Sequence, residues 1–69
     1  MNIKEKIGKK LKAFRTEKKL SQEKLAHLAN LDRTYIPDIE KGERNISVTV
    51  LEKLATALNI PIKDFFDED

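Results

Sequence analysis

Hydrophobic positions recur at helical spacing along most of this 69-residue chain. Near the N-terminus they are separated by four, four and three residues, which predicts an amphipathic helix over residues 3–18. The apolar members of this stripe are Ile3, Ile7, Leu11 and Phe14. Later in the chain, spacings of three, three, one and three predict another helix, which begins after a Ser47 cap and ends at Asn59. Its stripe consists of Val48, Leu51, Leu54, Ala55 and Leu58.

The segment between these stripes, from Ser21 to Gly42, predicts two short helices joined by a tight turn. The Ser21 side chain can cap the first of these helices by accepting a backbone N–H, and Asp32 can cap the second in the same way. Gly42 supplies the left-handed position that ends the second helix. The inward face is expected to consist of Leu25, Ala26, Ala29, Ile36 and Ile39.

A short last helix is predicted from Ile62 to Phe66, because Pro61 suits a first helical position, where its missing N–H would be unpaired in any case. Gly8 lies inside the first helix, where glycine costs about 1 kcal/mol relative to alanine. We therefore expect another helix to approach closely there. The fold class is all-α: a compact five-helix bundle that contains a helix-turn-helix, in a single domain over residues 1–69.

Composition limits the setting in which such a small domain works. A chain of 69 residues can bury only a small core, so dimerisation is expected to add to its stability. The absence of cysteine excludes disulfides and thiolate zinc sites. Lysines interrupt the N-terminal apolar positions, and no apolar run approaches membrane-spanning length. We expect a cytoplasmic protein with no membrane partner, although a basic amphipathic first helix leaves membrane binding as a minor alternative.

The net charge of +2 hides an asymmetry between the two ends of the chain. Residues 1–45 contain 12 Lys and Arg against 7 Asp and Glu, a net charge of +5, whereas residues 46–69 contain 2 against 5, a net charge of −3. A basic part beside an acidic part suits a molecule that presents one face to phosphates and another to protein, although charged faces are usually only solvated.

Catalytic and metal-binding constellations are not found in the sequence. His27 is the single histidine and is expected on the solvent side of its helix, while the serines are better explained as caps. The acidic residues near the C-terminus lack the glycine and the spacing of a calcium loop. We therefore expect neither an enzyme nor a bound metal or cofactor.

Three hydrogen-bonding side chains point outward at the start of the second helix of the Ser21–Gly42 segment: Arg33, Thr34 and Tyr35. Such groups can pair with base edges in the major groove of DNA. Gln22 lies in the first turn of the preceding helix, where exposed N–H groups favour an anion, so it can contact a DNA phosphate. The segment therefore predicts a DNA-binding helix-turn-helix.

Three strings in and around this segment have a family likeness when taken together: LSQEKLA, NLDRTYI and IEKG. They resemble the lambda-repressor and Cro type of helix-turn-helix. Residues 7–15, IGKKLKAFR, and 51–66, LEKLATALNIPIKDFF, resemble the first and last helices of that family. The strings LDRTYI and GERNIS are most similar to the controller proteins of restriction-modification systems.

The resemblance implies roles for particular residues. Arg33 and Thr34 match the positions that reach bases, the controller proteins add the tyrosine that matches Tyr35, and Arg44 matches a DNA-contacting arginine of the following loop. It also implies an ion pair between Arg15 and Glu40. This pair is expected to position the second helix of the motif against the first helix of the chain, with no large net gain in stability. Further phosphate contacts are expected from Gln22, Lys41, Asn45 and Ser47.

Pro37 departs from the family pattern, because controller proteins usually carry a small polar, DNA-contacting residue there. If Asp32 is the cap, Pro37 is the fifth helical residue, and its ring and missing N–H disturb the helix at Arg33. Such a proline can cost about 3 kcal/mol, or less if the first turn loosens to 3₁₀ geometry. The hypothesis is that the start of the DNA-reading helix is distorted and that operator affinity or specificity differs from that of relatives.

The expected function is that of a sequence-specific transcriptional regulator, a homodimer on a pseudo-palindromic operator. Residues 47–66 are expected to supply the dimer interface, because Val50, Ile62 and Phe66 are left over from the core stripes, unless they simply complete the core. The expected partners are double-stranded DNA and a second copy of the chain, with RNA polymerase as a further candidate. The alternative is an antitoxin-like protein-interaction module on the same fold.

Overall fold

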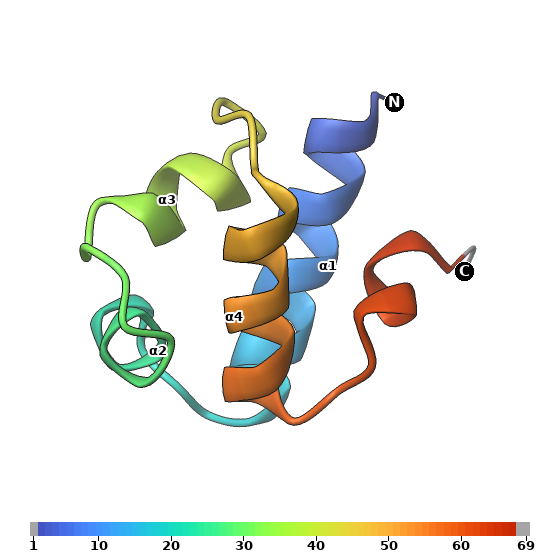
Figure 1. Ribbon diagram of the computed structural model, residues 1–69. Coiled ribbons are helices and arrows are strands. Elements are labelled where there is room, and N and C mark those ends of the chain that lie inside the picture. The colour runs from blue at the N-terminus through green and yellow to red at the C-terminus, as the bar shows by residue number, and fades with distance from the viewer. Residues whose placement is uncertain (1, 68–69) are drawn as a thin grey trace.

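Helices account for most of residues 2–67, the part of the chain that the computed structural model describes (Figure 1). Four are α-helices: α1 (Ile3–Glu17), α2 (Gln22–Leu28), α3 (Tyr35–Glu40) and α4 (Val48–Leu58). The last, η1 (Ile62–Phe66), is a 3₁₀ helix. In Figure 1, α2 and α3 lie on one side of α4 and η1 lies on the other, with α1 behind.

The all-α prediction is confirmed for the described residues, but the count of five α-helices is wrong. Residues 62–66 form a 3₁₀ helix, which opens with a hydrogen bond from the N–H of Asp64 to the carbonyl of Pro61 at 3.0 Å. A helix of five residues has room for such short-range bonds but for little of the longer α-helical ladder. Pro61 precedes this helix in an extended conformation instead of forming its first residue.

Most of the predicted helix ends are confirmed. The Ser21 hydroxyl accepts the N–H of Lys24 at 3.0 Å, and the Ser47 hydroxyl accepts that of Val50 at 3.1 Å. Gly42 follows α3 with φ 75°, and the left-handed Asn59 ends α4 with φ 58°. At the start of α1, a capping box that we had not predicted joins Asn2 and Glu5 through reciprocal hydrogen bonds of 2.9 and 3.1 Å.

The start of α3 corrects the prediction for Asp32, which does not cap the helix. Its carboxylate accepts the backbone N–H of Thr34 at 2.9 Å and the Thr34 hydroxyl at 2.8 Å, so it organises the turn before the helix. The helix begins at Tyr35, two residues later than expected. Pro37 is therefore its third residue, in the first turn, where a backbone N–H has no intrahelical partner to lose.

The core lies between all five helices, α1 to α4 and η1, and includes all the apolar residues predicted to face inward from the helix-turn-helix. Phe65 of η1 is fully buried and packs edge to face on Phe14 of α1, with ring centroids 5.6 Å apart. Two members of the predicted stripes are not in the core: Ile3 is exposed and Val48 is 77% exposed. Each is the first residue of its helix, and both line the groove between the starts of α1 and α4.

Gly8 confirms the expected close approach of another helix. A Cβ atom built on Gly8 would collide with the carbonyl oxygen of Ile39 and would lie 3.0 Å from that of Glu40. The end of α3 therefore rests on the backbone of α1, where there is no room for a side chain. This contact fixes the distance between α3 and α1.

None of the helices within residues 2–67 has the length and apolar character needed to cross a membrane.

Candidate nucleic-acid interface

The orientation of α3 is fixed by a cluster of polar side chains around Glu40. Arg15 of α1 donates from Nε and Nη2 to the two carboxylate oxygens of Glu40, at 2.6 and 3.1 Å, and from Nη1 to the carbonyl of Leu20 at 2.8 Å. Only 12% of the Arg15 side chain and 6% of the Glu40 side chain are exposed. Donation of these hydrogen bonds to the Glu40 carboxylate raises the pKa of Arg15 above its ordinary value. The ion pair implied by the family resemblance is therefore present and joins α1 to the end of α3.

Gln22 belongs to the same cluster, which the sequence did not reveal. Its Nε2 donates to the Glu40 carboxylate at 3.0 Å, so one end of its amide is engaged inside the protein. The side chain is half-buried at the start of α2. Gln22 thus links α2 to α3, in addition to the phosphate contact predicted for it.

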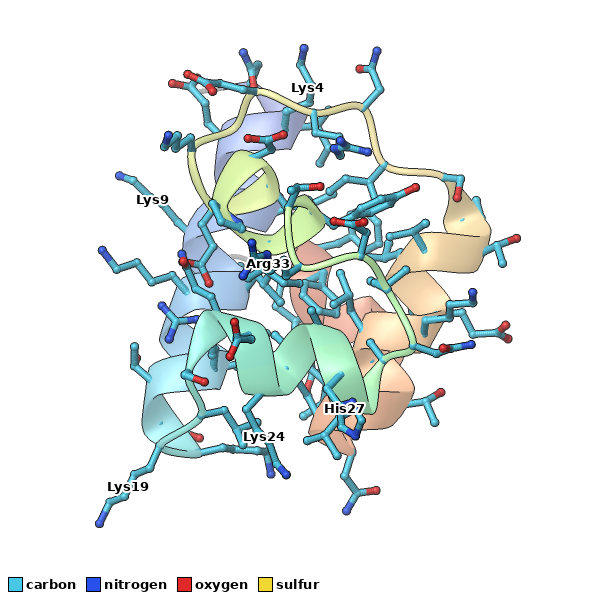
Figure 2. The ribbon with its side chains drawn as sticks, turned by 90° about the vertical axis from the view of Figure 1, so that its left-hand side faces the viewer. Lys4, Lys9, Lys19, Lys24, His27 and Arg33 are labelled. Atoms are coloured by element: carbon cyan, nitrogen blue, oxygen red, sulfur yellow. The ribbon has the colours of Figure 1, made fainter. Side chains whose placement is uncertain are left out.

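Arg33 lies at the centre of the face that α2 and α3 present in Figure 2. It precedes α3 in the turn organised by Asp32, and its side chain is 76% exposed. Its Nη1 lies 3.5 Å from the Glu23 carboxylate of α2, which is equally exposed. An ion pair this exposed contributes little to stability, so the guanidinium remains available to a ligand.

Thr34 and Asp32 form a small exposed unit beside Arg33. The two hydrogen bonds from Thr34, first that of its backbone N–H and then that of its hydroxyl, lower the pKa of the Asp32 carboxyl. The charges of Arg33 and Arg44 add to this lowering. The turn before α3 is therefore ordered by Asp32 and Thr34, with Arg33 between them.

Tyr35 and Arg44 are in direct contact, although nine positions separate them in the sequence. The guanidinium carbon of Arg44 lies 4.1 Å from the centroid of the Tyr35 ring, and its Nη2 lies 3.6 Å from the Asp38 carboxylate of α3. Arg44 belongs to the segment that follows α3, so these contacts dock that segment on the helix. The structure thus brings together Arg33, Thr34, Tyr35 and Arg44, the residues expected to reach bases.

The residues predicted to contact phosphates lie around this group. Lys41, Asn45 and Ser47 are exposed in the segment after α3, although the Ser47 hydroxyl also caps α4. Figure 2 shows further cations that we had not singled out: Lys9, Lys19 and Lys24 lie to the left of Arg33 or below it, and Lys4 lies at the top of the view, where it also lines the groove between α1 and α4. Their signal in the sequence was the excess of positive charge in residues 1–45. This face therefore has the positive border that a polyanion requires.

Other chemistry does not gather on this face. His27 is exposed at the end of α2, as predicted (Figure 2). Over residues 2–67 no group of three or more His, Cys, Asp or Glu side chains could hold a metal ion. The arrangement of exposed arginines, lysines and hydroxyls on a rigid helix is suited to binding a ligand by hydrogen bonds and charge.

The residues predicted for the dimer interface are only partly exposed. Ile62 is 38% and Phe66 is 45% exposed, whereas Val50 is half-buried against the core. Phe66 also lines an apolar groove of about 280 Å³ between the starts of α1 and α4. Its apolar walls are Ile3, Ile7, Ile46, Val48, Leu51 and Phe66. The uncovered apolar surface thus centres on η1 and the starts of α1 and α4, more than on Val50.

Comparison with known proteins gives consistent matches. Residues 11–65 match the helix-turn-helix family model. The chain is 46% identical to control protein C.BamHI of Bacillus amyloliquefaciens over 67 residues, which cover 96% of this chain and 83% of that protein. It is 46% identical to control protein C.MunI of a Mycoplasma species, with coverage of 97% and 92%. Its fold is similar to that of the restriction-modification controller protein C.AhdI of Aeromonas hydrophila, with a TM-score of 0.89, 48% identity and coverage of 91% and 96%.

Proposed function

Because the chain belongs to the helix-turn-helix family, we propose that it is a sequence-specific DNA-binding transcriptional regulator of the restriction-modification controller type. The observation that carries the proposal lies at the start of α3, where Arg33 and Thr34 are exposed in the turn before the helix and Arg44 stacks on Tyr35. The likeness to controller proteins over nearly the whole chain supports the narrower assignment.

In this proposal α3 and the turn before it enter the major groove of DNA. Arg33 and Arg44 each carry a guanidinium that can donate two parallel hydrogen bonds to O6 and N7 of a guanine. Lys41, Asn45 and the other peripheral donors contact phosphates, which fix the register without reading sequence. The contact between Arg15 and Glu40 holds α3 at one angle to α1, so that these donors meet the base edges together.

The regulator acts as a homodimer on a pseudo-palindromic operator. Ile62 and Phe66, exposed on η1, support an interface at this end of the molecule, on the other side of α4 from α3 (Figure 1). Two copies joined there would each present α3 to DNA. The centres of the two half-sites are then about one helical turn, roughly 10 bp, apart.

Selection of bound sequences from random duplex DNA tests this function directly. The expected result is enrichment of an inverted repeat whose half-sites are spaced by about one helical turn. Sedimentation of the protein alone and with that DNA should show two copies per operator. Absence of any enriched sequence, together with a protein partner that copurifies in stoichiometric amount, would overturn the proposal in favour of a protein-interaction module.

A further inference from the structure

Asp38 is an acidic residue on the outer side of α3, where a DNA-binding surface would gain nothing from negative charge. Its side chain is 43% exposed and lies 3.6 Å from Nη2 of Arg44, whose side chain is 34% exposed. The same guanidinium stacks on the Tyr35 ring, 4.1 Å from its centroid. Two side chains of α3 therefore hold one arginine that comes from the next segment.

Folding stability does not account for this arrangement. An ion pair at such exposure contributes little to the free energy of folding, and a stacked arginine at the surface adds only a modest amount. A second contact already fastens the segment to α3, because the N–H of Glu43 donates to the carbonyl of Asp38 at 3.0 Å. This backbone hydrogen bond docks the loop on α3 without help from the Asp38 carboxylate.

We propose that Asp38 is a specificity-determining residue that acts through Arg44, biasing this arginine toward neutral base edges and away from phosphates. The inference rests on the proposed function, because it concerns the same DNA-binding face. A phosphate that binds Arg44 must approach the Asp38 carboxylate and is repelled by it. The O6 and N7 acceptors of a guanine carry no net charge, so the carboxylate opposes them far less.

The Tyr35 ring and the Asp38 carboxylate also order Arg44 before DNA arrives. A long side chain loses rotamer freedom when it binds, and one that is already held in place loses less. Ordering helps a base contact, which needs two aligned hydrogen bonds, more than it helps a phosphate contact, which tolerates many geometries. Repulsion of phosphates and ordering of Arg44 therefore both favour binding to the operator over binding to random DNA.

Binding of DNA by Asp38→Asn tests the inference, because this change removes the charge and keeps the shape. Fluorescence anisotropy would give the Kd for the selected operator and for a random duplex of equal length, at several salt concentrations. We expect the ratio of the two affinities to fall by about threefold to tenfold, mainly through tighter binding of the random duplex. Glu17→Gln removes an exposed charge from the end of α1 and should leave the ratio unchanged.

An Arg44→Ala background separates action through Arg44 from a direct effect of the carboxylate on DNA. In that background Asp38→Asn should change the affinity ratio by less than about twofold, because the residue through which it acts is gone. A fall in the ratio that persists without Arg44, or no fall in the parent protein, would overturn the inference. A parent protein that fails to prefer the operator at all would instead overturn the proposed function.

Discussion

The carbonyl oxygen of Ile39 lies against Gly8 so closely that no Cβ atom fits between α1 and α3. Gly8→Ala should therefore lower the free energy of unfolding by about 1–3 kcal/mol, since the atoms in the way are backbone atoms. This loss is expected although alanine favours the helix by about 1 kcal/mol over glycine. Urea unfolding measures the change, and Lys9→Ala, an exposed neighbour in α1, should stay within about 0.5 kcal/mol of the parent. A Gly8→Ala protein as stable as the parent would contradict the contact.

Removing the charge of Glu40 should destabilise the protein strongly, because it leaves the largely buried Arg15 guanidinium unpaired. We expect Glu40→Gln to cost about 3–5 kcal/mol in urea unfolding. The double variant Arg15→Met with Glu40→Leu carries no unpaired charge and should recover most of that loss. If the pair serves to position α3, this double variant should still bind the operator more weakly than the parent. Full operator affinity in the stable double variant would argue against a positioning role.

Adjacent phenylalanines of η1 should respond differently to truncation. Phe65 is fully buried against Phe14, so Phe65→Ala should cost about 3–5 kcal/mol of stability. Phe66 is 45% exposed, and its loss should leave the fold largely intact while weakening self-association. Thermal unfolding and sedimentation of the two variants make the comparison. Equal loss of stability, with no effect of Phe66→Ala on association, would place the dimer interface elsewhere.

Arg33 is expected to read a base, because it is exposed at the centre of the proposed DNA-binding surface and only loosely paired with Glu23. Arg33→Ala should cost about 1–3 kcal/mol in binding to the cognate site and should barely change binding to random duplex DNA. Lys41→Ala provides the contrast, since loss of a phosphate contact weakens binding to both kinds of DNA and reduces the salt dependence. Equal losses on both DNAs for Arg33→Ala would assign Arg33 to the phosphate backbone.

The parts of the fold that were predicted from the sequence depend on local rules. The caps at Ser21 and Ser47 and the left-handed turn at Gly42 each involve residues only a few positions apart. The buried face of the helix-turn-helix follows from helical periodicity alone. Gly8 was informative because a glycine inside a helix needs a reason, and close approach of a neighbouring backbone is a common one.

The errors in the prediction come from competition between neighbouring groups and from long-range contacts. Asp32 was expected to cap α3, but its carboxylate instead accepts the backbone N–H and the hydroxyl of Thr34, and these two hydrogen bonds form a turn. Val48 fits the apolar stripe of α4, yet burial depends on how far the adjoining elements extend. The stacking of Arg44 on Tyr35 joins residues from two segments, and no short pattern in the sequence encodes it.

Pro37 provides a test in which the sequence-based hypothesis and the structure lead to opposite expectations for stability. A strained mid-helix proline would make Pro37→Ser more stable than the parent by up to about 3 kcal/mol. In the structure Pro37 is the third residue of α3, and no intrahelical bond is lost there. Pro37→Ser should then be less stable by about 0.4–1 kcal/mol, because serine gives the unfolded chain more freedom.

Operator affinity should rise in Pro37→Ser even as stability falls, because the new hydroxyl supplies the small polar group that the resemblance to controller proteins implies at this position. One added hydrogen bond corresponds to an increase of about twofold to tenfold. Pro61→Ser makes the same replacement beside η1 (Figure 1) and is the control for stability alone, because it should also lower the melting temperature by giving the unfolded chain more freedom. Unchanged melting temperature and unchanged affinity in Pro37→Ser would mean that this position influences neither the helix nor the DNA. A rise in both would instead show that the proline strains the DNA-reading helix of the parent protein.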